Sequence, residues 1–299
     1  MRSLALAISI AAIAVVPAAA QNSGVLYWNM PTTPAQLAFA ASSAAMSDEP
    51  QGLAANPAAL AAVSWRSLST AGVQWWEGIY GGSVGATLPL AKRRGTVWAA
   101  LGYWSSGSMA GYDDRGAPLG NISAQAVSGA AGYGYQLFGG FAAGLALKFS
   151  ALTLPQRRDL GFAADCGAQY RWRSLAAALL VQDLGPKYPV NGADRATLPT
   201  AVSLGGRLSL WRERITVAAQ YTARDGERPQ PSAGLAVSPV PLITVRVGLD
   251  GQRDRPQMSP LGLGLAVRTT GKQDYTIEYG YRSHGDLGRV QALALGISF

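Results

Sequence analysis

The last residues of the chain alternate between two kinds of side chain. Leu293, Leu295, Ile297 and Phe299 share one face of an extended strand, and the residues between them are small or polar. Successive strand residues point to opposite faces, so one face is bulky and apolar and the other is small. This pattern predicts a strand of a membrane β-barrel, and a terminal aromatic residue is typical of bacterial outer-membrane barrels.

Similar alternation recurs through the chain after residue 65. Bulky residues such as Tyr275, Ile277 and Tyr279 alternate with polar ones such as Thr276 and Glu278, which indicates a polar interior. We predict an all-β fold, a transmembrane antiparallel β-barrel of about 14 strands over residues 66–299, each near the ~9–11 residues that a tilted membrane strand needs. The expected strands are 66–75, 79–90, 95–105, 121–137, 140–152, 159–171, 174–183, 198–210, 214–223, 230–238, 240–250, 258–269, 273–283 and 287–299.

The connections between these strands alternate in length, except that the first outside connection, 74–78, is short. Short ones are expected near 91–94, 138–139, 172–173, 211–213, 239 and 270–272, and mostly longer polar ones near 106–120, 153–158, 184–197, 224–229, 251–257 and 284–286. Bacterial barrels have short periplasmic turns and longer outside loops, so both ends of this barrel are expected in the periplasm. A soluble β-sandwich would also alternate, but it explains neither the loop order nor the terminal Phe299.

The N-terminus predicts export. Met1-Arg2 is followed by an apolar run from Leu4 to Val16, and three alanines at 18–20 supply a small-residue cleavage site. This is the pattern of a secretory signal peptide over residues 1–20. The alternative, an N-terminal membrane anchor, is less favoured because the apolar run is short for a spanning helix.

Residues 21–65 are Ala-rich and lack strand alternation. Within them Asn56 can cap a helix whose first position suits Pro57. We therefore predict a short helix inside a separate N-terminal segment of residues 21–65, before the barrel begins.

Composition excludes several kinds of site. The chain has one Cys, one His and a formal net charge of +8, and its basic residues lie mainly in short turns. A scattered distribution does not favour nucleic-acid binding, and single Cys and His residues exclude an internal disulfide and any two-imidazole site. Cys166 is expected on the lipid-facing side of its strand.

Catalysis is not expected, and no cofactor or metal is implied. A serine hydrolase needs a base beside its nucleophile, but His284 falls in an expected outside loop and should be solvated there. Asp113 and Asp114 fall short of a calcium loop and favour a turn. Trp75 and Trp76 are expected in the outer aromatic girdle.

The charged residues that point inward under this register are the candidate lumen residues. Lumen side chains tune the selectivity of a barrel. In the alternative interpretation they pair with one another or with the N-terminal segment and hold the barrel in shape. The candidates are Lys148, Asp165, Arg207, Arg246, Asp250, Arg268, Asp274, Glu278 and Arg282.

Three stretches together resemble the PorV/PorQ-type branch of the FadL-like outer-membrane proteins. The family pattern has Gly after Asn-Pro-Ala, where this chain has Ala59. The family also has Asn-Leu-Gly, and in this chain Asp183 replaces the Asn of that motif. The stretches are the run 48–60 with Asn56, Pro57 and Ala58, the run Gln182-Asp183-Leu184-Gly185 with Leu198-Pro199 and Leu204-Gly205-Gly206, and the end with its Gly-rich 261–267 and Tyr-rich 275–281.

The resemblance implies a fourteen-stranded barrel whose N-terminal segment plugs the lumen through Asn56, Pro57 and Ala58. It leaves two functions open for what we expect to be a monomer in contact with outer-membrane lipid. One is passage of a small hydrophobic solute, which should be accompanied by an apolar pocket under the outside loops and a lateral opening or kinked strand. The other is a scaffold or shuttle for secreted proteins of a type IX secretion machinery, which should be accompanied by a sealed lumen and exposed apolar loops.

Overall fold

The computed structural model describes residues 31–39, 44–46, 56–91, 95–113, 115–155, 157–190, 194–251 and 259–299. The predicted signal peptide over residues 1–20 lies outside the described residues. The predicted plug segment, residues 21–65, is described only in part.

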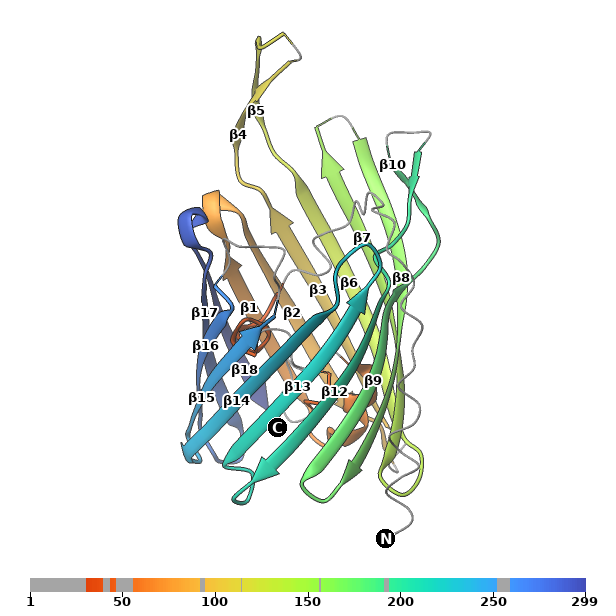
Figure 1. Cartoon of the computed structure of the whole chain (residues 1–299), viewed down its shortest axis with the longest axis vertical. Helices are drawn as coiled ribbons and strands as arrows, with labels where there is room; N and C mark the ends of the chain where they lie inside the picture. Colours follow the sequence, from red (N-terminus) through yellow and green to blue (C-terminus); the bar gives the residue numbers. More distant parts are fainter. Residues whose placement is uncertain are drawn as a thin grey trace.

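Fourteen antiparallel strands form a closed barrel, which confirms the predicted fold and strand number (Figure 1). Each of the fourteen expected ranges overlaps a different barrel strand. The strands are β1 (Ser67–Gln74), β2 (Tyr80–Pro89), β3 (Thr96–Ser105), β6 (Gln125–Gln136), β7 (Phe141–Leu154), β8 (Arg157–Trp172), β9 (Leu175–Leu184), β12 (Ala201–Leu210), β13 (Ile215–Arg224), β14 (Gln230–Val240), β15 (Ile243–Asp250), β16 (Leu261–Arg268), β17 (Asp274–Ser283) and β18 (Arg289–Ser298).

The first and last strands close the barrel. β1 and β18 pair from Ser67 opposite Ser298 upward. Arg66 and Phe299 extend this ladder by one rung, because their backbones exchange hydrogen bonds of 3.1 and 2.9 Å. Closure pairs the backbone groups that an open sheet would leave at its edges, which is what hydrocarbon surroundings require.

The outer face of the barrel is covered by exposed apolar side chains. Leu147 is 70% exposed, and Ile277 and Leu293 project outward with their strand neighbours of the same parity. A belt of this size would be unfavourable in water and is what a membrane-spanning barrel presents to lipid. Among the described residues, no helix is both long enough and apolar enough to cross a membrane.

Two expected outside loops contain hairpins of their own. β4 (Met109–Tyr112) pairs with β5 (Pro118–Ile122), and β10 (Tyr188–Val190) pairs with β11 (Asp194–Ala196). The β4–β5 hairpin rises above the barrel rim (Figure 1). Its tip is a turn in which the Asp113 carboxylate accepts the backbone N–H groups of Arg115 and Ala117.

The loop expected at 153–158 is instead mostly strand. β7 and β8 run on until they are separated only by residues 155–156. Thr153 pairs with Arg158 and Leu154 with Arg157, so polar residues at this end extend the ladder beyond the apolar part of the wall. The prediction from side-chain polarity therefore ended both strands too early at this end.

In the described part of the N-terminal segment, two short helices lie inside the barrel. α1 (Pro34–Ala38) packs against β15–β18, and η3 (Pro57–Ala62), a 3-10 helix, packs against β3 and β6–β8. The Asn56 side chain caps η3 by accepting the Ala58 N–H at 3.0 Å, and its amide donates to the Ala44 carbonyl at 2.7 Å. The helix thus begins where the Asn-Pro pair predicts. Asn56 also connects it to residues 44–46, which we call the middle of the plug.

Both helices rest on glycines of the wall. A Cβ at Gly248, Gly262 or Gly280 would collide with the backbone of α1, and a Cβ at Gly134 or Gly144 would collide with η3. Only glycine permits such close backbone approach. We call these two sets of residues the α1 seat and the η3 seat.

Replacing Gly280 with valine should unseat α1 without preventing barrel formation. The added Cβ would lie 2.6 Å from the Pro34 carbonyl oxygen, and backbone cannot move aside as a flexible side chain can. We expect the folded Gly280→Val protein to lose protease protection of its N-terminal segment. Limited proteolysis after refolding into vesicles measures this.

The matched control is Gly72→Val on β1, where nothing lies within 4 Å of the added Cβ. Equal protection of the two variants would contradict the assignment of Gly280 to the α1 seat.

Candidate functional site

The α1 seat lies between two buried ion pairs. Arg246 of β15 reaches Glu278 of β17 at 3.4 Å, and Arg282 of β17 reaches Asp250 of β15 at 2.9 Å. The Arg246 guanidinium also lies 5.9 Å from the centre of the Phe39 ring, which follows α1. These charges hold three adjacent strands together and contact the plug.

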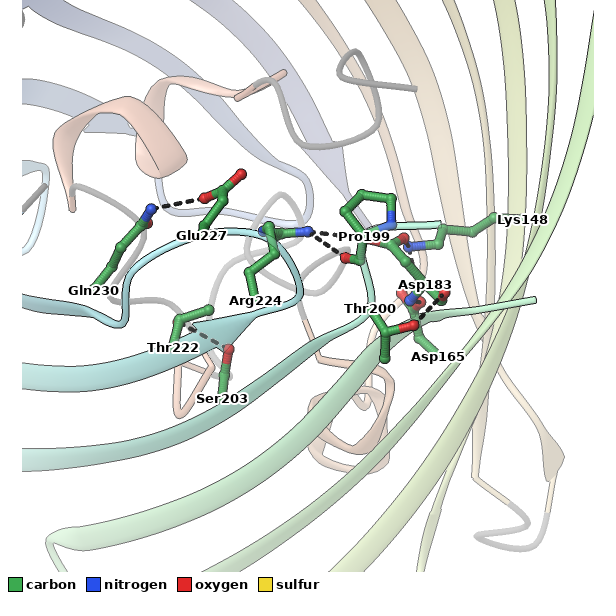
Figure 2. Close-up of polar contacts among 10 residues, drawn as sticks. All are labelled: Lys148, Asp165, Asp183, Pro199, Thr200, Ser203, Thr222, Arg224, Glu227 and Gln230. Atoms are coloured by element: carbon green, nitrogen blue, oxygen red, sulfur yellow. Dashed lines mark hydrogen bonds and ion pairs between the residues drawn. The ribbon is translucent and has the colours of Figure 1, made fainter. Parts of the chain in front are cut away.

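A second charged group lies across β7, β8, β9 and β13. Lys148 contacts Asp165 at 2.8 Å and Asp183 at 2.5 Å, and Arg224 contacts Asp183 at 3.3 Å. Arg224 also donates to the Pro199 carbonyl at 2.9 Å. Figure 2 shows Lys148, Asp165 and Arg224 around Asp183. Asp183 therefore links four strands and, through Arg224, the segment before β12.

Asp183 occupies a bulge that ends the pairing of β8 with β9. The register runs from Cys166 opposite Val181 to Ala164 opposite Leu184, so β9 carries one extra residue there. Asp183 has a φ of 60°, and its N–H donates to the Asp165 carboxylate at 2.9 Å. A bulge of this kind bends a strand and leaves a residue outside the ladder.

Above the bulge the wall has a different construction. β8 continues to Arg157, yet among the described residues its pairing with β9 stops at Ala164. Residues that follow β9 pack against β8 here: Gly185 lies directly against the backbone of Phe162, and β10 contacts β8. We call the junction between residues 157–163 of β8 and residues 185–190 and 194–200 the seam.

The predicted lumen residues fall into two sets. Those away from the strand ends are largely buried: Lys148, Asp165, Arg207, Arg246, Asp250, Glu278 and Arg282. Arg268 and Asp274 share the inward parity but lie at the ends of β16 and β17, where they form an exposed pair at 2.8 Å. These two residues belong to the rim of the barrel.

Four polar residues of the site were missing from the sequence-based set. Gln220 accepts the Ala44 N–H at 2.8 Å and Gln169 donates to the Ala45 carbonyl at 3.0 Å, so wall glutamines hold the middle of the plug. Arg224 shares the inward parity of Gln220 and could have been found by extending β13 one residue. Asp183 could not, because the bulge reverses the parity of β9 at that point.

An aromatic cluster covers α1 on the side of the loops that contain residues 75–78 and 284–287. His284 is 1% exposed, and its ring lies 4.4 Å from that of Trp76 and 5.8 Å from that of Trp75. Trp104 and Leu37 of α1 complete the packing. The expected solvation of His284 is therefore wrong, as is the expected place of Trp75 and Trp76 in a lipid-facing girdle.

The physical reason is the fold of two short loops. η4 (Trp76–Gly78) and η6 (Gly285–Leu287) turn the large rings inward, where they bury apolar surface against one another. Cys166 keeps the outward parity of β8 and is half-buried. Within the described part of the chain, no three His, Cys, Asp or Glu residues gather as a metal site would require.

An apolar pocket of about 700 Å³ lies on the outer wall. Its lining includes Leu68, Leu101, Leu147 and Phe162, all of which project away from the lumen. This position differs from the pocket expected under the outside loops of an uptake channel.

Several solved outer-membrane channels share this fold. The chain superposes on the Pseudomonas putida toluene transporter TodX with a TM-score of 0.62 and 12% identity, covering 90% of this chain and 98% of that one. The Ralstonia pickettii toluene transporter TbuX gives 0.62 and 11%, with 91% and 98% covered. A Pseudomonas aeruginosa FadL homologue gives 0.58 and 10%, with 90% and 98% covered.

Sequence comparison adds nothing to this, since no protein-family model and no curated protein sequence matches the chain. Identities this low establish a common fold. The class defined by fold and site is a closed fourteen-stranded membrane barrel with an internal plug.

Asp183→Asn should destabilise the barrel. Asparagine keeps the shape and tolerates the left-handed backbone, but it removes the charge that Lys148 and Arg224 share. We expect the free energy of unfolding to fall by about 1–3 kcal/mol, measured by urea unfolding in phospholipid vesicles.

Asp274→Asn provides the matched comparison, because it makes the same change in an exposed rim pair, which contributes little. If both substitutions gave the same stability as the parent protein, the charged group at Asp183 would have no structural role.

Proposed function

We propose that the protein is an outer-membrane channel that takes up a small hydrophobic solute past an N-terminal plug. The belt of exposed apolar side chains supports a membrane position, and the polar inner face supports a lumen. α1 and η3 occupy that lumen, so passage requires the plug to shift or the solute to leave sideways.

The seam is the observation that carries this proposal. A continuous ladder of strands would block sideways movement, but at the seam the pairing of β8 with β9 ends and a loop replaces it. Transfer of a hydrophobic solute through the wall at the seam would be favourable, since lipid lies on the other side. The group formed by Lys148, Asp165, Asp183 and Arg224 holds this part of the wall together.

The fold neighbours suggest the first solute to test. Two are named as toluene transporters, and another is named as a monoaromatic hydrocarbon channel. We propose a small apolar molecule, about as large as toluene, as the solute. Under the same proposal the chain is exported by its signal peptide, both ends of the barrel face the periplasm, and Asn56, Pro57 and Ala58 anchor the plug.

One observation favours a second candidate function, a scaffold or shuttle for secreted proteins of the PorV/PorQ type. The β4–β5 hairpin stands above the rim with Tyr112 64% and Leu119 59% exposed. Exposed apolar residues outside the membrane are typical of protein-binding surfaces. The secretion role requires no passage of solute through the lumen.

A removable lock on the plug tests the transport proposal. A Cβ at Gly205 would lie 3.1 Å from that of Ala44, close to the ~3.5–4.5 Å found in disulfides. In a Cys166→Ser background, we expect Ala44→Cys with Gly205→Cys to block toluene uptake when oxidised and restore it on reduction. Uptake of radiolabelled toluene by cells expressing the protein measures this.

The two single-cysteine variants control for the substitutions themselves. Uptake by the unmodified protein no greater than by cells lacking it would overturn the transport proposal and favour the scaffold. Equal uptake by the oxidised and the reduced double-cysteine protein would show that the plug need not leave its contact with Gly205.

Deleting residues 21–63 should open an ion-conducting pore. Removal of α1 and η3 would expose a polar lumen whose buried charges then meet water. We expect a large rise in conductance across planar bilayers relative to the intact protein. Similar low conductance in both forms would mean that wall side chains and loops alone close the barrel.

A further inference from the structure

A row of small side chains crosses the lipid-facing wall. Ala86 of β2 pairs with Ala99 of β3, and Ala99 pairs with Ala131 of β6. Each of the three faces outward and is exposed. Leu68 of β1 continues the row at one end and Leu147 of β7 at the other, so bulky residues close a floor made of methyl groups.

Larger side chains flank this floor on both sides. The row two residues away on one side contains Val84, Leu101, Phe149 and Phe162, and on the other side Leu88, Val97, Tyr133 and Leu145. Phe149 lies over Gly129, where a Cβ would collide with its ring. We call the floor and its flanks the trough. The apolar pocket of about 700 Å³ lies between the floor and the first of these rows, since Val84, Leu101, Phe149 and Phe162 line it.

The trough has room for part of a hydrocarbon chain. Strands are ~4.8 Å apart, so the floor of three alanines spans ~10 Å, and the strands of Leu68 and Leu147 at its ends lie ~19 Å apart. A bilayer core is ~30 Å thick, so a chain from one leaflet spans ~15 Å. Barrel strands tilt by ~35–45°, so a trough that runs across them is inclined by ~45–55° to the membrane normal, and a chain lies in it obliquely over part of its length.

We propose that this trough is a binding site for one acyl chain of an outer-membrane lipid. The lining is apolar and lies within the lipid-facing belt, so hydrocarbon fills it and water does not. Within a bilayer there is no hydrophobic gain from leaving lipid, so selectivity comes from packing. A chain in the trough gains dispersion contacts from the floor and from the flanking row, whereas one on a flat wall gains them on one side.

The trough lies next to the seam. Phe162 belongs both to the wall of the trough and to the part of β8 that forms the seam. A chain held in the trough therefore ends beside the point where strand pairing stops. The binding site itself does not depend on the proposed transport function.

Photocrosslinking tests the proposal on the full-length protein. The protein is refolded into phosphatidylcholine vesicles that contain a small fraction of phosphatidylcholine with a diazirine on one acyl chain. After irradiation, digestion and mass spectrometry map the modified residues. We expect adducts to concentrate on the trough, and Ala99→Phe, which fills its floor, to reduce them severalfold.

Ala219→Phe is the matched control. Ala219 also faces outward, from β13, which is six strands away from β3 around the fourteen-stranded barrel. Heat-modifiable migration in gels checks that each variant has folded, and Ala131→Leu provides a second filling substitution if Ala99→Phe has not.

Three results would overturn the proposal. Even labelling of outward residues around the barrel would mean ordinary surrounding lipid only. Displacement of the label by added toluene, but not by unlabelled phospholipid, would assign the trough to the solute. Labelling of outward residues all around the barrel except in the trough would mean that another copy of the chain covers it.

Discussion

The enclosure of the plug depends on contact between its backbone and the backbone of the wall. At the α1 and η3 seats a single added carbon atom would collide with main-chain atoms, so glycine is required at Gly144, Gly248 and Gly262. Glycine weakens a strand because it brings no packing of its own and loses more entropy on folding. The plug compensates by supplying the buried apolar surface, chiefly Leu37, Phe39 and Leu60, that the small-residue inner face lacks.

The charged residues follow from the same arrangement. A plug that excludes water from the inner wall leaves any charge there desolvated, which is costly unless an opposite charge lies beside it. Arg246 with Glu278 and Arg282 with Asp250 meet this requirement across strands. The bulge at Asp183 meets it differently, because a residue taken out of the ladder can turn its carboxylate towards both Lys148 and Arg224.

The strands could be predicted from the sequence because lipid outside and polar groups inside impose a period of two on every strand. That rule fails where one residue is inserted, so Asp183 was not recognised as an inward charge. The period of two does not apply to loops. There the burial of Trp75 and His284 depends on packing between segments far apart in the chain. The rule also treats every small inward residue alike, so it could not separate the glycines that carry the plug from the alanines beside them.

The two seats lie at different distances from the plug along the chain. The η3 seat is made by β6 and β7, whereas the α1 seat needs β15–β17, and the barrel closes only when β18 meets β1. Contacts between distant residues are formed late in folding, because they require the longest loops to close. The order of the chain thus favours a sheet that curls around a plug already held at η3, with α1 enclosed last. The wall then closes around the plug, so the plug need not be threaded into a finished barrel.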